Sequence, residues 1–333
     1  MNIRILVLSV LVAVSGGAAW LLSSEPKQQQ VQSGPGPLFE RLARDSQKVS
    51  SVKIESHNGV LFQADRSSGR WLANHLSPDA GFPVNTRVVS SLITGLSRAR
   101  VVEKKTSKPE NYARLGVEDL SSSNARSVRV TLSDGKDSWQ VLLGNNARQQ
   151  GGMFVRLDGD PASLLIDQRL RLPASATDWL ASAVLPFRED ALEQIEFSQP
   201  ATTALLLARK PRNEQQWHIV TDGTALAPIR DEELAYPQII SQTITDMLDF
   251  RFLSVRPYQQ ARWEAHPMAG RVVFTLADNT QVMAQIKPAA EPSQYLIWID
   301  SPDSPSWVSD WIFTVSAYQG KAYLTNLGSL LAR

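Results

Sequence analysis

Cysteine is absent from the 333-residue chain. This absence excludes disulfides, thiolate nucleophiles and cysteine-ligated metals together, and it is compatible with an oxidising compartment. Charge of one sign is also lacking, since 34 Lys and Arg face 33 Asp and Glu. The resulting net charge of +1 gives no global field to attract nucleic acid, so we predict no nucleic-acid partner.

The usual signatures of catalytic and cofactor sites are missing too. The chain has 4 histidines, and no two of them have the four-residue spacing of a helical metal pair. Neither phosphate-binding glycine loop, G-x-x-x-x-G-K-[ST] or G-x-G-x-x-G, occurs. Carboxylates are numerous but dispersed, so a hydrolase assembled by folding is the last of our hypotheses. We therefore predict a protein that is not an enzyme and has no cofactor or metal.

A long uncharged segment begins the chain. Residues 5–22 contain 18 residues without a charge and follow Arg4. As a helix they would reach about 27 Å, close to the thickness of a hydrocarbon core. A cleaved signal peptide competes with this reading, because residues 15–19 are small, but Trp20-Leu21-Leu22 continue the apolar run. We predict a membrane anchor at residues 1–22, with the signal peptide as the alternative.

The next segment, residues 23–37, is polar and rich in Gln, with interspersed Pro and Gly. It lacks the apolar residues needed to bury a core, so we predict a flexible linker.

Two similar halves follow the linker. Alternating strands, tight turns such as Asn58-Gly59, and an amphipathic helix with Val88, Leu92 and Leu96 mark the first half. The second half repeats this order, and its Ile240, Ile244 and Leu248 each lie 152 residues after their counterparts. We expect a helix over residues 173–185 to close the first half.

These matches favour an internal duplication. The predicted fold class is α+β, with two tandem β-β-α-β-β-β repeats and mainly antiparallel sheets after the N-terminal transmembrane helix. The predicted boundaries place the first repeat at residues 38–190 and the second at residues 191–333.

The stretch Pro109-Glu110-Asn111-Tyr112-Ala113-Arg114-Leu115-Gly116-Val117, with Trp71 and the Asp134-Gly135 hairpin, is the most recognisable signature. On these residues the chain resembles the bacterial domain of unknown function 4340. The second half departs from the signature at residues 263–267. The resemblance implies a membrane-anchored protein that accompanies ABC transporters of the gliding-motility type, and it supplies no catalytic residues.

Two features point weakly to binding. Residues 87–108 carry six basic side chains against the single acid Glu103, and no aromatic residues interleave with them. This basic run suits acidic lipid headgroups or an acidic partner surface, although a solvated helix end and loop is the favoured explanation because charge runs usually face water. Trp298, Trp307 and Trp311 cluster in the second half, and Trp307 follows a Pro/Ser-rich loop. The candidate partner-binding residues are Arg98, Arg100, Lys104, Lys105 and Trp307.

The function that these observations favour is a non-catalytic accessory or scaffold component of an ABC-type transport system. We expect a single-pass protein of the bacterial inner membrane with its bulk in the periplasm, contacting the permease and ATPase subunits. The alternative is a periplasmic binding module for an envelope glycan or small ligand, on which exposed tryptophans would stack.

Overall fold

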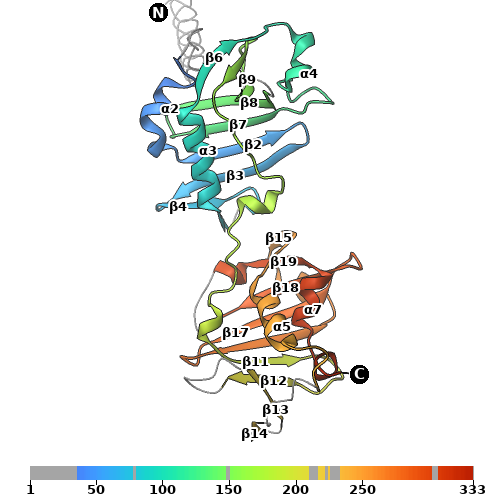
Figure 1. The fold of residues 1–333 in the computed structure, drawn as a ribbon. Coiled ribbons are helices and arrows are strands. Elements are labelled where there is room, and N and C mark those ends of the chain that lie inside the picture. The colour runs from blue at the N-terminus through green and yellow to red at the C-terminus, as the bar shows by residue number, and fades with distance from the viewer. Residues whose placement is uncertain are drawn as a thin grey trace, which may run out of the picture. The chain divides into compact units, whose positions relative to one another are not determined.

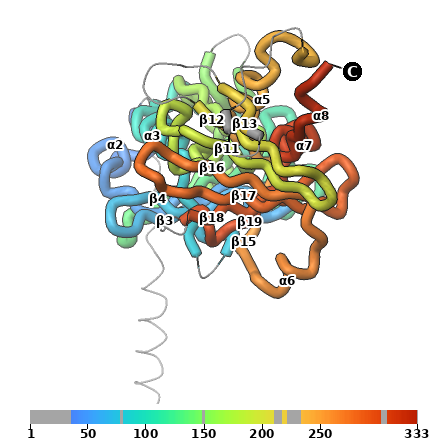
Figure 2. Tube along the Cα trace, turned by 90° about the horizontal axis from the view of Figure 1, so that it is seen from below, coloured from blue at the N-terminus to red at the C-terminus, as the bar shows by residue number. Residues whose placement is uncertain are grey.

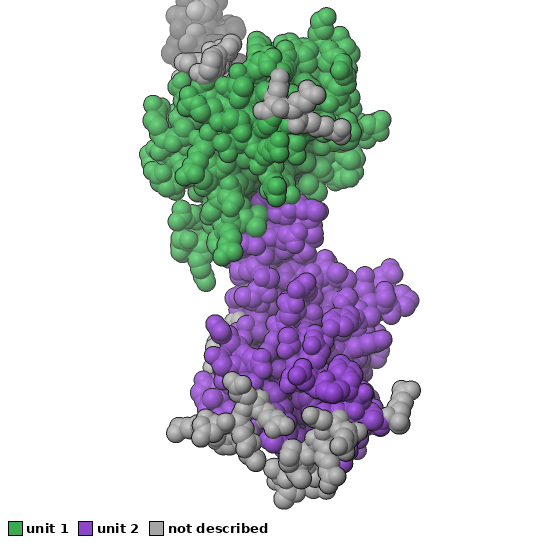
Figure 3. Space-filling view, viewed as in Figure 1, with its two compact units in different colours: residues 1–71, 86–172 green, residues 72–85, 173–333 purple. Residues whose placement is uncertain are grey.

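The computed structural model describes residues 36–77, 80–147, 151–209, 217–221, 224–225, 233–301 and 307–332. Within them the chain divides into two compact units (Figure 3). The first unit holds the described residues up to Trp71 together with Thr86–Leu172. The second unit holds Leu72–Asn85 and Pro173–Arg333. This division falls between residues 172 and 173 rather than between 190 and 191, and it gives the second unit an early segment of the chain.

The first half of the chain contributes ten strands to one sheet, in the order β1-β6-β10-β9-β8-β7-β2-β3-β4-β5. Its strands are β1 (Gly36–Pro37), β2 (Ser51–Ser56), β3 (Gly59–Ser67), β4 (Arg70–Ala73), β5 (Phe82–Pro83), β6 (Arg100–Lys104), β7 (Val128–Ser133), β8 (Ser138–Asn146), β9 (Met153–Leu157) and β10 (Ser163–Ile166). Its helices are α2 (Glu40–Asp45), η1 (Ser46–Lys48), α3 (Thr86–Arg98), η2 (Pro109–Asn111) and α4 (Tyr112–Leu115).

The second half forms a nine-stranded sheet in the order β14-β13-β12-β11-β16-β17-β18-β19-β15, and Figure 2 labels its strands except β14. Its strands are β11 (Leu192–Ser198), β12 (Leu205–Arg209), β13 (Trp217–Thr221), β14 (Thr224–Ala225), β15 (Ser254–Pro257), β16 (Gly270–Leu276), β17 (Gln281–Pro288), β18 (Gln294–Asp300) and β19 (Trp311–Ser316). Its helices are η3 (Ala176–Trp179), η4 (Glu189–Ala191), α5 (Ile239–Leu248), α6 (Gln260–Glu264), η6 (Trp307–Asp310), α7 (Ala317–Tyr323) and α8 (Leu327–Leu330).

The strands pair in antiparallel fashion in both sheets, which confirms the predicted α+β class with antiparallel sheets. The predicted β-β-α-β-β-β order is wrong in detail. In the described residues the first half has five strands before its main helix, α3, and five after it, whereas the second half has four strands before α5 and five after it. The additional strands include β5 and β14, which have two residues each and are too short for a periodic pattern.

Helix α3 lies across one face of the first sheet (Figure 1). Its apolar side chains recur at helical spacing, and the buried ones are Val89, Leu92, Ile93 and Leu96. The sheet strands alternate buried and partly exposed residues, as β2 and β7 do. One face of the sheet therefore forms the core with α3, as the amphipathic pattern predicts.

Residues 173–185 do not form the predicted helix. Only Ala176–Trp179 is helical, as a short 3-10 turn that Ser175 caps by accepting a hydrogen bond from the backbone N–H of Thr177. After this turn Leu180 forms an isolated antiparallel bridge with Val84 in the early segment of the same unit. Beside this bridge the N–H of Asn85 donates to Trp179 O at 2.8 Å and the N–H of Ala181 donates to Pro83 O at 2.9 Å. Pairing with a distant segment has overridden the local helical pattern.

The N-terminal predictions fall mainly outside the described residues. No helix in the described ranges is long and apolar enough to cross a membrane, and the predicted anchor at residues 1–22 precedes them. The linker prediction fails at its end, because Gly36–Pro37 forms β1 and pairs with Val101 and Arg100 of β6.

Candidate functional site

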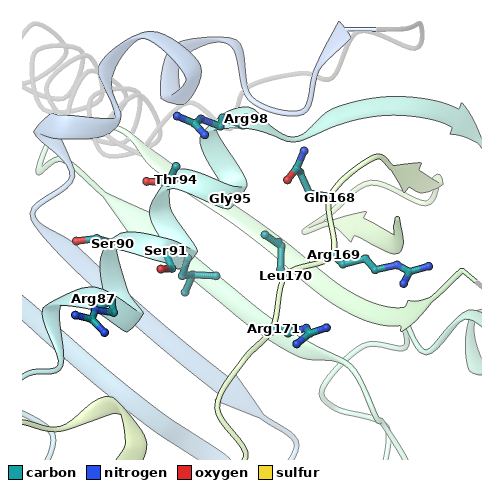
Figure 4. Close-up of a pocket in the computed structure, with 11 residues that line it drawn as sticks. Arg87, Ser90, Ser91, Thr94, Gly95, Arg98, Gln168, Arg169, Leu170 and Arg171 are labelled. Carbon is teal, nitrogen blue, oxygen red and sulfur yellow. The ribbon is translucent and has the colours of Figure 1, made fainter. Parts of the chain in front are cut away.

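A groove rich in arginine runs along the outer side of α3. It has a volume of about 550 Å³ and lies between α3 and residues 168–171, which follow β10 (Figure 4). We call it the arginine groove. Its lining residues are Arg87, Ser90, Ser91, Leu92, Thr94, Gly95, Arg98, Gln168, Arg169, Leu170 and Arg171.

The groove depends on a close contact between the side chain of Leu170 and the backbone of α3 at Gly95. Leu170 is 8% exposed and packs on α3 at Gly95, where an added Cβ would lie 2.5 Å from Leu170 Cδ2. Asp167 fixes the start of the segment, because its Oδ1 accepts a hydrogen bond from Arg100 N at 2.9 Å. The absence of a side chain at position 95 therefore lets residues 168–171 lie against the helix.

The four arginines of the groove are exposed and carry its charge. No Asp or Glu is among the lining residues. Within the described part of the chain, the guanidinium groups of Arg87, Arg98, Arg169 and Arg171 form no ion pair. Figure 4 shows Arg87 and Arg98 on the α3 side and Arg169 and Arg171 on the other, with their side chains directed away from one another. The groove is therefore a cationic surface with two arginines on each side, and the four guanidinium groups do not converge on a single point.

The structure brings only some of the predicted binding residues to this groove. Arg98 lines it, and Arg100 lies beside it at the start of β6. Lys104 is exposed at the far end of β6, while Lys105 Nζ pairs with Glu103 Oε2 at 2.5 Å. Trp307 is half-buried in the second unit, with its ring edge-to-face against Phe82 at 4.8 Å between centroids.

Sequence reasoning missed Arg169 and Arg171. A signal for them exists in Arg169-Leu170-Arg171-Leu172, where basic and apolar residues alternate, so that leucine packs while arginine faces solvent. Their proximity to α3 depends on Gly95, which no local pattern reveals.

The other two tryptophans of the cluster pack within the second unit. Trp311 is fully buried, and Trp298 stacks on Tyr258 at 4.5 Å between ring centroids. Trp298 Nε1 also donates a hydrogen bond to Ser309 O at 2.8 Å. Core packing accounts for these rings, so the tryptophans give no specific support to a glycan platform.

The signature stretch at residues 109–117 covers a buried arginine. Arg156 on β9 is 4% exposed, and its Nε donates a hydrogen bond to Val117 O at 3.0 Å. Its guanidinium carbon lies 4.6 Å from the centroid of the Tyr112 ring and its Nη2 pairs with the Asp119 carboxylate. A cation, a ring and backbone carbonyls thus hold this stretch on the sheet, and we call the arrangement the Arg156 clasp.

A similar arrangement lies in the second unit. Lys287 on β17 is 4% exposed, and its Nζ donates hydrogen bonds to Trp263 O at 2.6 Å and His266 O at 2.8 Å. The same Nζ lies 4.6 Å from the centroid of the Trp263 ring. Burial lowers the pKa of Lys287, and the negative charge of Glu264 opposes this effect. The contacts of Lys287 account for its burial as a structural cation.

Raising the pH toward 10.5, the ordinary pKa of lysine, is expected to stabilise the wild-type protein relative to a Lys287→Met variant. Because the folded-state pKa of Lys287 is lowered, the unfolded chain holds the proton more tightly in the window below 10.5, so the unfolding free energy rises with pH there. Urea midpoints of both proteins between pH 7 and pH 10 measure this difference. A difference independent of pH would contradict it.

No three His, Asp or Glu side chains in the described ranges gather in a group that could hold a metal ion.

Comparisons with known proteins give one match. A family model described as domain of unknown function (DUF4340) matches residues 71–266, which is more than half of the chain. No curated protein and no solved structure matches. The matched residues include α3, the arginine groove, the Arg156 clasp and part of the second unit up to His266. The chain therefore belongs to the DUF4340 family.

Proposed function

We propose that this protein is a non-catalytic, membrane-anchored accessory component of an ABC-type transport system and acts through protein contacts in the periplasm. The single observation that carries the contact role is the arginine groove, a surface with four exposed guanidinium groups and no acid in its lining. Such a surface recognises an acidic partner by charge complementarity. The transport context rests on the resemblance carried by residues 109–117, and the anchor rests on the uncharged residues 5–22.

We also infer that the two halves arose by duplication. Support comes from the strand orders, because β6-β10-β9-β8-β7-β2-β3-β4-β5 corresponds position by position to β15-β19-β18-β17-β16-β11-β12-β13-β14. Each half also places an aromatic ring against a buried cation, Tyr112 on Arg156 and Trp263 on Lys287. A duplicated scaffold with different surfaces suits a protein that contacts more than one subunit.

Affinity isolation from gently solubilised membranes is expected to recover permease and ATPase subunits with the wild-type chain. Reversing two charges in the groove, with Arg98→Glu and Arg171→Glu, should reduce recovery by about tenfold or more, because buried or partly buried charge pairs at an interface contribute several kcal/mol. Mass spectrometry of the isolated material measures the recovery. The exposed Arg70 lies outside the groove lining, so Arg70→Glu serves as the control of equal charge change.

Two results would contradict the proposal. One is a wild-type isolate that lacks transporter subunits while the transporter itself is intact in the same membranes. The other is equal recovery with the groove variant and the Arg70→Glu control.

A further inference from the structure

We propose that the arginine groove binds an extended acidic segment of a partner protein, about five residues long, with carboxylates on both sides of the segment. Arg87 and Arg98 would meet carboxylates on the α3 side, and Arg169 and Arg171 would meet those on the other. The inference rests on the proposed function only in taking the partner to be a protein. It names the chemistry by which that partner is recognised.

The charges of the groove select the class of ligand. Its cations are all arginines, and a guanidinium presents paired N–H donors that match a carboxylate in bidentate geometry. The nearest acid along the chain, Asp167, already accepts hydrogen bonds from Arg100 N and from Gln168 Nε2, at 2.9 Å and 3.4 Å. A carboxylate of a ligand therefore does not have to displace an Asp or Glu of the lining from the arginines.

The spacing of the arginines selects an extended ligand. Arg87 and Arg98 are eleven residues apart on α3, which corresponds to about 17 Å along the helix axis. An extended peptide advances about 3.3 Å per residue, so about five residues cover this length. Because the guanidinium groups point away from one another, one small anion cannot contact all four.

The floor of the groove suits a peptide backbone. Ser90, Ser91 and Thr94 are exposed on the lining and offer hydroxyl groups that both donate and accept hydrogen bonds. Leu92 and Leu170 are largely buried beneath them and close the floor. A strand lying in the groove can bond to the hydroxyls through its main chain while alternate side chains reach the arginines on either side.

The recessed shape favours a peptide over a membrane surface. Anionic headgroups form a plane, and a plane meets the outermost cations of a surface first. The groove is instead a cavity of about 550 Å³ that a narrow chain can enter. Figure 4 shows Ser91 and Leu170 between the arginines of α3 and Arg169 and Arg171, whereas Ser90 and Thr94 lie on the side of Arg87 and Arg98. We therefore commit to an acidic peptide and treat anionic lipid as a competing outcome.

The test uses the purified full-length chain and a fluorescent peptide with five consecutive glutamates, read by fluorescence anisotropy. We expect the glutamate peptide to bind, and a glutamine peptide of the same length to bind at least tenfold more weakly. Affinity should fall as salt rises from 50 to 300 mM, since exposed charge pairs are screened. Arg98→Glu with Arg171→Glu should abolish binding, while Arg70→Glu should leave it within about twofold of wild type.

Milder variants guard against misfolding. Arg98→Gln with Arg171→Gln removes charge without adding repulsion and should weaken binding about tenfold, with an unchanged circular dichroism spectrum. These side chains are exposed, so the fold does not depend on their burial.

Several outcomes would overturn the inference. They are the absence of glutamate-peptide binding, equal binding of the glutamine peptide, and insensitivity to the groove substitutions. Preferential binding to vesicles containing phosphatidylglycerol, with the groove arginines required, would assign the groove to a membrane surface instead. Displacement of the peptide by inorganic phosphate at equal concentration would reduce the site to one for small anions.

This experiment separates the inference from the proposed function. Peptide binding by the purified protein, together with isolates that lack transporter subunits, would retain the groove chemistry and reject the transport role. Recovery of transporter subunits that falls with the groove variants, without binding of the glutamate peptide, would retain the proposed function and reject recognition of an extended acidic segment.

Discussion

A Phe82→Ala substitution is expected to lower the melting temperature of the second unit by about 10 °C. The side chain of Phe82 is fully buried, and its ring lies edge-to-face against Trp307 and Trp311 at 4.8 and 5.1 Å between centroids. Phe313 and Phe252 lie at 6.2 and 5.9 Å. Truncating such a ring leaves a cavity among rigid neighbours and costs about 4 kcal/mol of unfolding free energy. For a unit of this size, each kcal/mol corresponds to roughly 2–4 °C.

Tryptophan fluorescence and near-UV circular dichroism during heating are suitable measurements, since two tryptophans contact the deleted ring. The control is Tyr236→Ala in the same unit, whose side chain is 50% exposed and whose removal should change the melting temperature by about 1 °C or less. If the melting temperature of Phe82→Ala differed from wild type by no more than that of Tyr236→Ala, the ring of Phe82 would contribute little to the stability of the core.

A Gly116→Val substitution should destabilise the first unit by about 2–3 kcal/mol. Gly116 ends α4 with φ 72° and ψ 31°, a left-handed conformation that a β-branched residue strongly disfavours. An added Cβ would also lie 2.9 Å from Asn145 Oδ1. Moving Asn145 would break the hydrogen bond that its Nδ2 donates to Arg114 O at 3.1 Å. Backbone strain of about 1–2 kcal/mol and the lost contact of about 1 kcal/mol together give the expected effect.

The matched control for this prediction is Gly135→Val. Gly135 also has a positive φ, of 86°, but an added Cβ there meets no atom within 4 Å. It should cost only the backbone strain, about 1–2 kcal/mol. Urea denaturation followed by circular dichroism compares the two variants. If both variants lose the same free energy of unfolding, the Asn145 side chain can move away at no cost, and the close packing beside Gly116 does not contribute to stability.

The parts of the fold with local repeating patterns were predictable from the sequence. The hairpin at Asn58-Gly59 and the helix around Leu92 have alternation or helical spacing, and both are present as β2–β3 and α3. The helix expected at residues 173–185 does not form because the backbone there pairs with residues 83–85. No local sequence pattern predicts this pairing. A short stretch of sequence does not predict structure that depends on pairing with a distant segment.

The sequence also predicts only part of the candidate site. Arg98 stands out in a basic run that can be counted in the sequence, but its neighbours in the groove come from residues 168–171. Conversely, Lys105 belongs to the same run but is paired with Glu103. A count of charges therefore identifies basic sequence, whereas only the fold decides which cations share a surface.

The early segment Leu72–Asn85 has a consequence for how the protein is made. The segment belongs to the second unit but is synthesised before most of the first unit. During translation Phe82 leaves the ribosome long before Trp307 and Trp311, the rings that will bury it, so the second unit cannot complete its core until the end of the chain has emerged. Until then an apolar ring stays without its partners, and a chaperone has time to bind it. A fragment beginning at Pro173 would likewise lack this ring, so dissecting the protein into halves requires supplying residues 72–85 with the second one.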